Sequence, residues 1–264
     1  MSATSMSFAE SGHNGRNFAG DQRPGLRQIT LVELRKMTNT RSGFWVPICV
    51  ALVMLAIALI GSLNDGGSKA TVGHIFHICT TPATYLLPIM GVLLVCGEWS
   101  QRTTLTTFTL VPSRGRVMAA KLAASVIVST IALILGLVLA LVIPALVGHA
   151  PGGAGSLQLT VILQGWLMLV AGMIMGLAFG AAILVSAPAI VAYLLLPVIW
   201  DAVIGGIHIF DGVARWLDSS NTLAPLTQYP LSGSEWGHAL ATLAVWVGIP
   251  LLVGLNRIGR GDIN

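Results

Sequence analysis

Charged side chains are scarce in this sequence of 264 residues, in which Asp, Glu, Lys and Arg make up 9% of the chain. An average soluble domain carries about 25% of these residues. Hydrophobic residues make up 55% of the chain, and the mean hydropathy is +0.82. This composition excludes an ordinary soluble protein, a disordered chain and a disulfide-stapled secreted domain. It leaves a helical membrane protein that crosses the bilayer several times.

The chain also lacks the motifs of the common enzyme classes. It has no Gly-x-x-x-x-Gly-Lys-Ser/Thr motif, and Gly66-Gly67-Ser68-Lys69 does not have the required spacing. No His-Glu-x-x-His motif, Ser/His/Asp trio or pair of carboxylates supports an intramembrane hydrolase. Cys49, Cys79 and Cys96 fall in apolar segments, without the spacing of disulfides or metal ligands. We therefore predict a chain that is not an enzyme and holds no cofactor or metal of its own.

Apolar runs long enough to cross a bilayer, which takes about 20 residues, occur six times. They cover about residues 44–63, 75–97, 122–147, 160–185, 189–209 and 237–255. Because the runs are continuous and do not alternate with period two, they predict helices and not a β-barrel. The predicted fold is an all-α integral membrane protein, with a flexible cytoplasmic tail over 1–25 and a six-span domain over 26–264.

The fourth and fifth spans have little sequence between them. From Leu122 to Trp200 the chain contains no charged residue. A single helix over residues 160–200 would be about 60 Å long, twice the ~30 Å hydrocarbon core. The chain must therefore turn once in this region, and Pro188 is the predicted place because proline disrupts a helix.

The positive charges are distributed unevenly between the loops. With six spans and both termini in the cytoplasm, all of the 14 Lys and Arg residues except Lys69 and Arg215 fall on the cytoplasmic side. This is the distribution of the positive-inside rule. It predicts a multi-pass protein of the bacterial cytoplasmic membrane, in contact with lipid. The net charge of +4 thus marks membrane orientation, and no nucleic-acid partner is expected.

Two segments on the predicted cytoplasmic side have helical patterns. Thr30 and Glu33 fit a capping box that would begin a short helix running to about Asn39. This segment is either an interfacial elbow helix or a solvated lead-in to the first span. In the loop from Glu98 to Lys121, the apolar residues Leu105, Phe108 and Leu110 precede a predicted helix stop at Pro112 and a cap at Ser113. A helix–turn–helix here would suit docking into a groove on a partner; the alternative is an ordinary positive-inside loop.

The loop over about 210–236 lies on the predicted outer side. Helical spacing links Phe210, Val213, Ala214 and Leu217, and Trp216 and Trp236 suit the interfacial aromatic belt. These residues indicate a short helix that lies on the outer surface or re-enters the membrane, with a plain loop as the alternative.

A few polar residues and glycines lie inside the predicted spans. Asp201, after a possible helix break at Pro197, is the only charged one; it either contacts cargo or is hydrated or bonded to His208 near the outer surface. His77 follows His74 by three residues, but without a third ligand we expect it to bond a backbone carbonyl freed by a proline kink. Gly172, Gly176 and Gly180 form a small-residue stripe that predicts close helix packing.

The sequence resembles the permease subunits of the ABC-2 family of ABC transporters. The resemblance rests on Glu98 just after the second span, on Arg102-Thr103, on Pro112-Ser113-Arg114 and on Lys121 at the start of the third span. Thr40-Arg41 and the six-span layout support it over most of the chain.

The resemblance implies that the segment around 98–112 is a coupling helix that contacts an ATP-binding subunit. It assigns that contact to Glu98, Arg102, Leu105, Phe108, Pro112 and Arg114. It also implies two copies of the ATPase, which would bind ATP and Mg, and a second permease subunit, with a homodimer favoured over a heterodimer. The cargo would be a hydrophobic or amphipathic molecule, such as a drug or lipid, moved out of the cell along a path near Asp201, His77 and His208.

Two other functions remain open from the residues alone. A six-span secondary transporter or channel would usually show internal repeats and several charges within the membrane, and we find no clear repeat. A membrane scaffold or immunity protein that moves no cargo is the other alternative.

Overall fold

The computed structural model describes residues 25–64, 71–100, 114–148, 157–204, 216–218 and 222–260. Within these ranges the chain forms helices and no β-strand. Six of the helical segments are long and apolar enough to cross a membrane: Gly43–Asn64, Val72–Gly97, Gly115–Leu146, Leu159–Ile183, Ser186–Val203 and Gly233–Arg257. The predicted all-helical class and the six apolar spans are therefore confirmed.

The elements follow one another with short connections. Their bounds are α1 Leu26–Asn39, α2 Arg41–Asn64, α3 Val72–Ser100, α5 Arg114–Leu146, α6 Leu159–Ile183, α7 Ser186–Ile204, η3 Ala224–Thr227, α10 Gly233–Leu243, η4 Ala244–Gly248 and α11 Ile249–Arg260. The element η4 is a π-helical turn, so that α10, η4 and α11 together make the last span.

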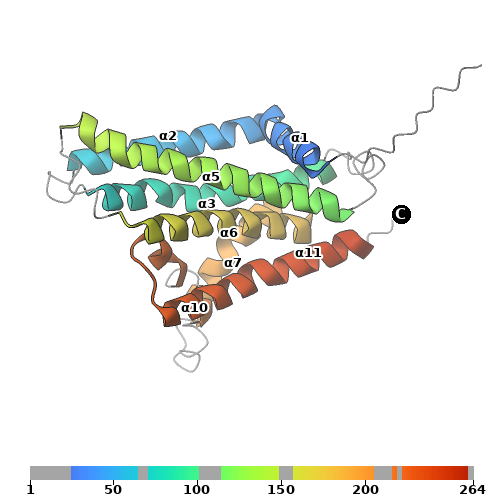
Figure 1. Cartoon of the computed structure of the whole chain (residues 1–264). Coiled ribbons are helices and arrows are strands. Elements are labelled where there is room, and N and C mark those ends of the chain that lie inside the picture. The colour runs from blue at the N-terminus through green and yellow to red at the C-terminus, as the bar shows by residue number, and fades with distance from the viewer. Residues whose placement is uncertain are drawn as a thin grey trace, which may run out of the picture.

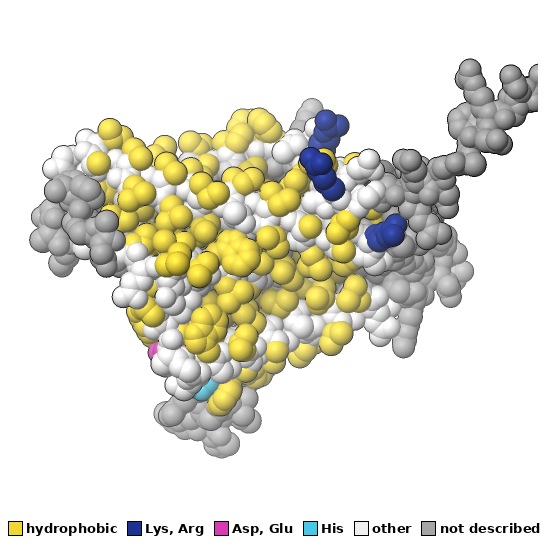
Figure 2. Space-filling model, viewed as in Figure 1, with side chains coloured by type: hydrophobic (Ala, Val, Ile, Leu, Met, Phe, Trp, Pro, Cys, Tyr) yellow, Lys and Arg dark blue, Asp and Glu magenta, His cyan; other side chains and the backbone are white. Residues whose placement is uncertain are grey.

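Helices α3 and α6 form the centre of the bundle. They pack against each other more extensively than any other pair, and α2 and α5 cover further sides of α3 (Figure 1). The core between them is completely buried at Phe76 of α3, Met54 of α2 and Met173 of α6. Helix α7 packs mainly on α6 and leaves most of its surface exposed. A lipid-facing surface of this kind is apolar, as Figure 2 shows for the visible face.

The start of α1 and the end of α11 lie at the same end of the bundle (Figure 1). Figure 2 shows Lys and Arg side chains gathered at this end, with apolar side chains covering the face beyond them. The folded chain thus collects positive charge at one end of its apolar helices, which is the arrangement that the positive-inside rule describes.

Helix α1 begins earlier than the capping box predicted, and Thr30 is not its N-cap. The helix begins at Leu26 after Gly25, whose N–H donates to the Gln28 side chain at 3.2 Å. Thr30 lies inside the helix and donates to the carbonyl of Leu26 at 2.9 Å. The prediction was wrong because Glu33, which the box would have used for capping, is buried in a tertiary contact.

The turn between the fourth and fifth spans also differs from the prediction. Helix α6 ends at Ile183 with Leu184 in the left-handed region, at φ 63°, and its N–H donates to the carbonyl of Gly180 at 2.8 Å. Helix α7 begins at Ser186, so Pro188 lies within its first turn, where a missing N–H costs no helical hydrogen bond. The break predicted at Pro197 is likewise absent, because α7 continues through this residue to Ile204.

Candidate functional site

A buried ion pair joins three helices at the positively charged end of the bundle. The Nζ atom of Lys121, on α5, lies 2.6 Å from Oε2 of Glu33, on α1, and the two side chains are 4% and 1% exposed. Lys121 also donates to the carbonyl of Leu94, on α3, at 3.1 Å. The other Glu33 oxygen, Oε1, lies 2.8 Å from Nζ of Lys36. We call these four residues the Glu33 cluster.

Sequence reasoning missed the Glu33 cluster, because Glu33 and Lys121 are 88 residues apart. Burial of two charges is tolerated only when each is paired and hydrogen-bonded, as these are. Leu94 lies one helical turn before Glu98, so the cluster fixes α3 immediately ahead of the predicted contact with the ATPase. It also holds the start of α5, the helix that leaves that segment.

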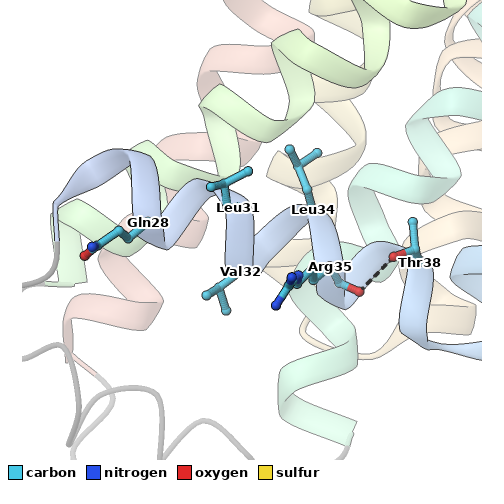
Figure 3. A pocket seen from close by; sticks show the side chains of 6 residues that line it. All are labelled: Gln28, Leu31, Val32, Leu34, Arg35 and Thr38. Carbon is cyan, nitrogen blue, oxygen red and sulfur yellow. Dashed lines mark hydrogen bonds between the residues drawn. The ribbon is translucent and has the colours of Figure 1, made fainter.

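The outer surface of α1 carries a groove of about 480 Å³, shown in Figure 3. The residues that line it are Gln28, Leu31, Val32, Leu34, Arg35 and Thr38. Leu31 and Val32 are about half exposed, while the opposite side of α1, including Ile29 and Met37, is buried. Helix α1 therefore has an apolar inner side and an outer side that mixes apolar and polar residues, which still allows the interfacial reading.

The predicted ATPase contact lies mostly outside the described residues. Arg102, Leu105, Phe108 and Pro112 are not described, and Glu98 is described only as part of the α3 backbone. Arg114 is the first residue of α5, directly after the predicted cap at Ser113. The docking role of this segment therefore stays a prediction.

A second polar cluster lies at the other end of α3. Nδ1 of His77 is 2.8 Å from Oγ1 of Thr227 in η3, so His77 does not bond the backbone carbonyl that we predicted. With its amide oriented to satisfy both atoms, Gln164 of α6 donates to the Tyr229 carbonyl at 3.0 Å and accepts from the Leu231 N–H at 2.8 Å. The short segment around η3 is thus attached to both central helices.

Neighbouring side chains support the same segment. Leu226 of η3 is completely buried against apolar residues that include Ala239. The Tyr229 hydroxyl donates to Oε1 of Glu235 at 3.2 Å. Partial desolvation and the negative charge of Glu235 raise the pKa of Tyr229, so its hydroxyl remains a donor at neutral pH. This part of the 210–236 region folds onto the spans and is not a plain loop.

We expect the His77–Thr227 contact to stabilise the attachment of η3. Replacing His77 with Ala or Thr227 with Val is expected to lower the free energy of unfolding by about 1 kcal/mol each, the usual net value of a hydrogen bond. The double variant should lose less than the sum, because both changes remove the same interaction. Unfolding in detergent, followed by circular dichroism, measures this coupling. Strictly additive losses would contradict a direct interaction.

The remaining candidate path residues are not brought together by the described part of the chain. Asp201 lies in the last turn of α7, with its Oδ1 atom buried, while His208 is outside the described residues. Trp200 stacks edge-on against Trp246, with ring centroids 6.2 Å apart. Among the described residues, no group of three or more His, Cys, Asp or Glu side chains could hold a metal ion.

The glycine stripe of α6 lies against the proline-containing part of α3. A Cβ on Gly176 would overlap the carbonyl oxygen of Pro88, and one on Gly180 would be 3.0 Å from the carbonyl oxygen of Val92. Because Pro88 has no N–H, it cannot donate to the carbonyl of Thr84. The hydroxyl of Tyr193, on α7, donates to that carbonyl at 3.3 Å. The bend in α3 is thus packed by α6 and hydrogen-bonded by α7.

Comparison with known proteins adds no assignment. No protein-family model matches the chain, and a search of curated proteins found no match. The function has to be argued from the residues of this chain and their arrangement.

Proposed function

We propose that the chain is the membrane-spanning permease subunit of an ABC-2-type exporter. In this proposal it resides in the bacterial cytoplasmic membrane and moves a hydrophobic or amphipathic cargo out of the cell. Two copies of a separate ATP-binding subunit, which bind ATP and Mg, drive it, and a second permease subunit completes the transporter. The chain itself hydrolyses nothing.

The observation that carries the proposal is the segment from Glu98 to Arg114 and the way its two ends are held. Its charged, threonine-rich and Pro-Ser-Arg pattern lies between α3 and α5. The Glu33 cluster fixes both of these helices at the end where Lys and Arg gather. A connector that only turned the chain would need a few residues. A longer segment on a rigid, three-helix base is suited to receive a push from a partner and pass it to the spans.

The first test is co-purification with the ATP-binding protein encoded next to this chain. We expect Glu98→Lys, or Asp at both Leu105 and Phe108, to reduce the recovered ATPase at least about ten-fold, equivalent to about 1.4 kcal/mol of binding free energy. The physical reason is a reversed charge, or a buried charge, at the proposed contact.

Arg260→Glu is the control, because it reverses a charge on the same predicted face but outside the proposed contact. Each variant should unfold at the wild-type denaturant concentration, which excludes a general loss of structure. Undiminished recovery of the ATPase and undiminished transport in the Glu98 and Leu105/Phe108 variants would show that the segment is not the contact. Transport that persists without any ATPase would favour the secondary transporter or channel.

A further inference from the structure

A tyrosine is exposed at the middle of the most central span. Tyr85 lies near the midpoint of α3, and its side chain is 61% exposed. Within the described part of the chain its hydroxyl makes no hydrogen bond. Hydrocarbon tails offer no acceptor or donor, and a hydroxyl left without a partner in an apolar environment costs about 1–3 kcal/mol by mutational measures. A purely lipid-facing position is therefore unfavourable for this side chain.

Tyr85 belongs to a polar face of α3, which we call the Tyr85 face and define as His74, Ile78, Thr81 and Tyr85. At about 100° per residue, positions four and eleven before Tyr85 lie on nearly the same side of the helix. His74 is exposed and Thr81 is partly exposed. Pro82 cannot donate an N–H to the carbonyl of Ile78, which adds a polar backbone group to the face.

The Tyr85 face lies between neighbouring helices. On one side the Ile78 side chain reaches α2, where it would collide with any Cβ added at Gly61. On the other side, Thr84 accepts the hydrogen bond of Tyr193 from α7. The face is thus open outward and bordered by α2 and α7, with a polar strip at membrane depth.

Other exposed positions at the same depth have different chemistry. Leu52, near the middle of α2, is 59% exposed, and Ile131, near the middle of α5, is 60% exposed. Both are aliphatic, as expected where lipid covers a helix. Three side chains of nearly equal exposure therefore divide into two that suit lipid and one that needs a polar neighbour.

We propose that the Tyr85 face lines the path along which cargo crosses the membrane, and that Tyr85 contacts the cargo. This inference rests on the proposed exporter function, in which the second permease copy closes the path from lipid. The ring of Tyr85 offers an apolar surface, and its hydroxyl offers a hydrogen bond. The cargo that fits this pair is an amphipathic small molecule with an apolar body and a hydrogen-bonding group. Water fills the path when cargo is absent.

The test compares the reactivity of three single cysteines in the assembled transporter in membranes. The background carries Cys49→Ser, because Cys49 is exposed, whereas Cys79 and Cys96 are buried. Tyr85→Cys, Leu52→Cys and Ile131→Cys are then treated with a charged methanethiosulfonate. This reagent reacts with the thiolate, which forms in water and is suppressed in an apolar environment.

We expect Tyr85→Cys to react at least about ten-fold faster than Leu52→Cys and Ile131→Cys. Thr81→Cys, one turn away on the same face, should also react quickly, which provides a second reading if Tyr85→Cys does not fold. Labelling of all four variants by a reactive maleimide after denaturation controls for the amount of protein. If Tyr85→Cys and Thr81→Cys react as slowly as the two lipid-facing positions, the inference is wrong.

This outcome is separate from that of the exporter proposal. Recovery of the ATPase with unreactive Tyr85→Cys and Thr81→Cys would overturn the path and leave the exporter intact. Fast labelling in a protein that recovers no ATPase would support a water-lined path and contradict the exporter.

Discussion

Replacing Lys121 with Met is expected to destabilise the protein by about 3–5 kcal/mol, the usual loss when one partner of a buried ion pair is removed. Glu33 is 1% exposed and would lose its closest charge, while Lys36 alone would remain beside it. The carbonyl of Leu94 would lose a donor in the same step. Because the cluster joins α1, α3 and α5, the loss should appear in the global unfolding of the spans and not only in α1.

The free energy of unfolding, measured by denaturant titration in detergent, checks this prediction. Lys36→Met is the matched control, because Lys36 pairs with the same carboxylate but its side chain is 37% exposed. Its loss should stay within about 1 kcal/mol, as for exposed ion pairs. The double variant Glu33→Met with Lys121→Met should regain much of the stability, since no unpaired charge remains buried. A Lys121→Met protein as stable as the wild type would show that the pair is not buried in the membrane-embedded molecule.

Replacing Gly176 with Ala is expected to cost about 3 kcal/mol or more, at or above the upper end of ordinary overpacking. The added Cβ would overlap the carbonyl oxygen of Pro88 and lie 2.6 Å from its carbonyl carbon and 2.8 Å from its Cα. All three are backbone atoms of α3, so no side-chain rotation relieves the collision. The two central helices would have to separate, and every helix packed on them would be affected.

Gly172→Ala provides the control on the same stripe. Its Cβ would meet only the Pro88 ring at 3.4 Å and the Thr84 carbonyl oxygen at 3.6 Å, which are ordinary contacts. This variant should differ from the wild type by no more than about 1 kcal/mol, the helix-propensity difference between Gly and Ala. The same denaturant titration distinguishes the two variants. Equal stability of the Gly172 and Gly176 variants would contradict the packing of α6 on Pro88.

The sequence predicted those features of the fold that depend on local composition. Six apolar runs identified the six spans, because each helix in a bilayer has to be continuously apolar. The turn after Ile183 could not be predicted in the same way. Its left-handed residue is Leu184, a residue type that rarely adopts this conformation, whereas Pro188 carried the stronger local signal.

The candidate sites were predicted less well, because they depend on tertiary contacts. Glu33 fitted a local capping box, and only the distant Lys121 explains why it is buried. His77 was expected to bond its own helix and instead contacts Thr227, far along the chain. Tyr85 was missed, although its spacing from His74 and Thr81 on one side of α3 is visible in the sequence. Periodicity of polar residues within an apolar run would have been the signal.

The charge-free stretch from Leu122 to Trp200 has a consequence for how the protein is made. Helices α5, α6 and α7 enter the membrane without a topogenic charge of their own, so their direction depends on the residues that precede them, of which Lys121 is the last. When Lys121 leaves the ribosome, Glu33 has already been synthesised and is available to accept it. A residue that first retains the α5 start in the cytoplasm during insertion is afterwards neutralised in the finished protein. One lysine thus orients the chain while it is being made and then locks that orientation.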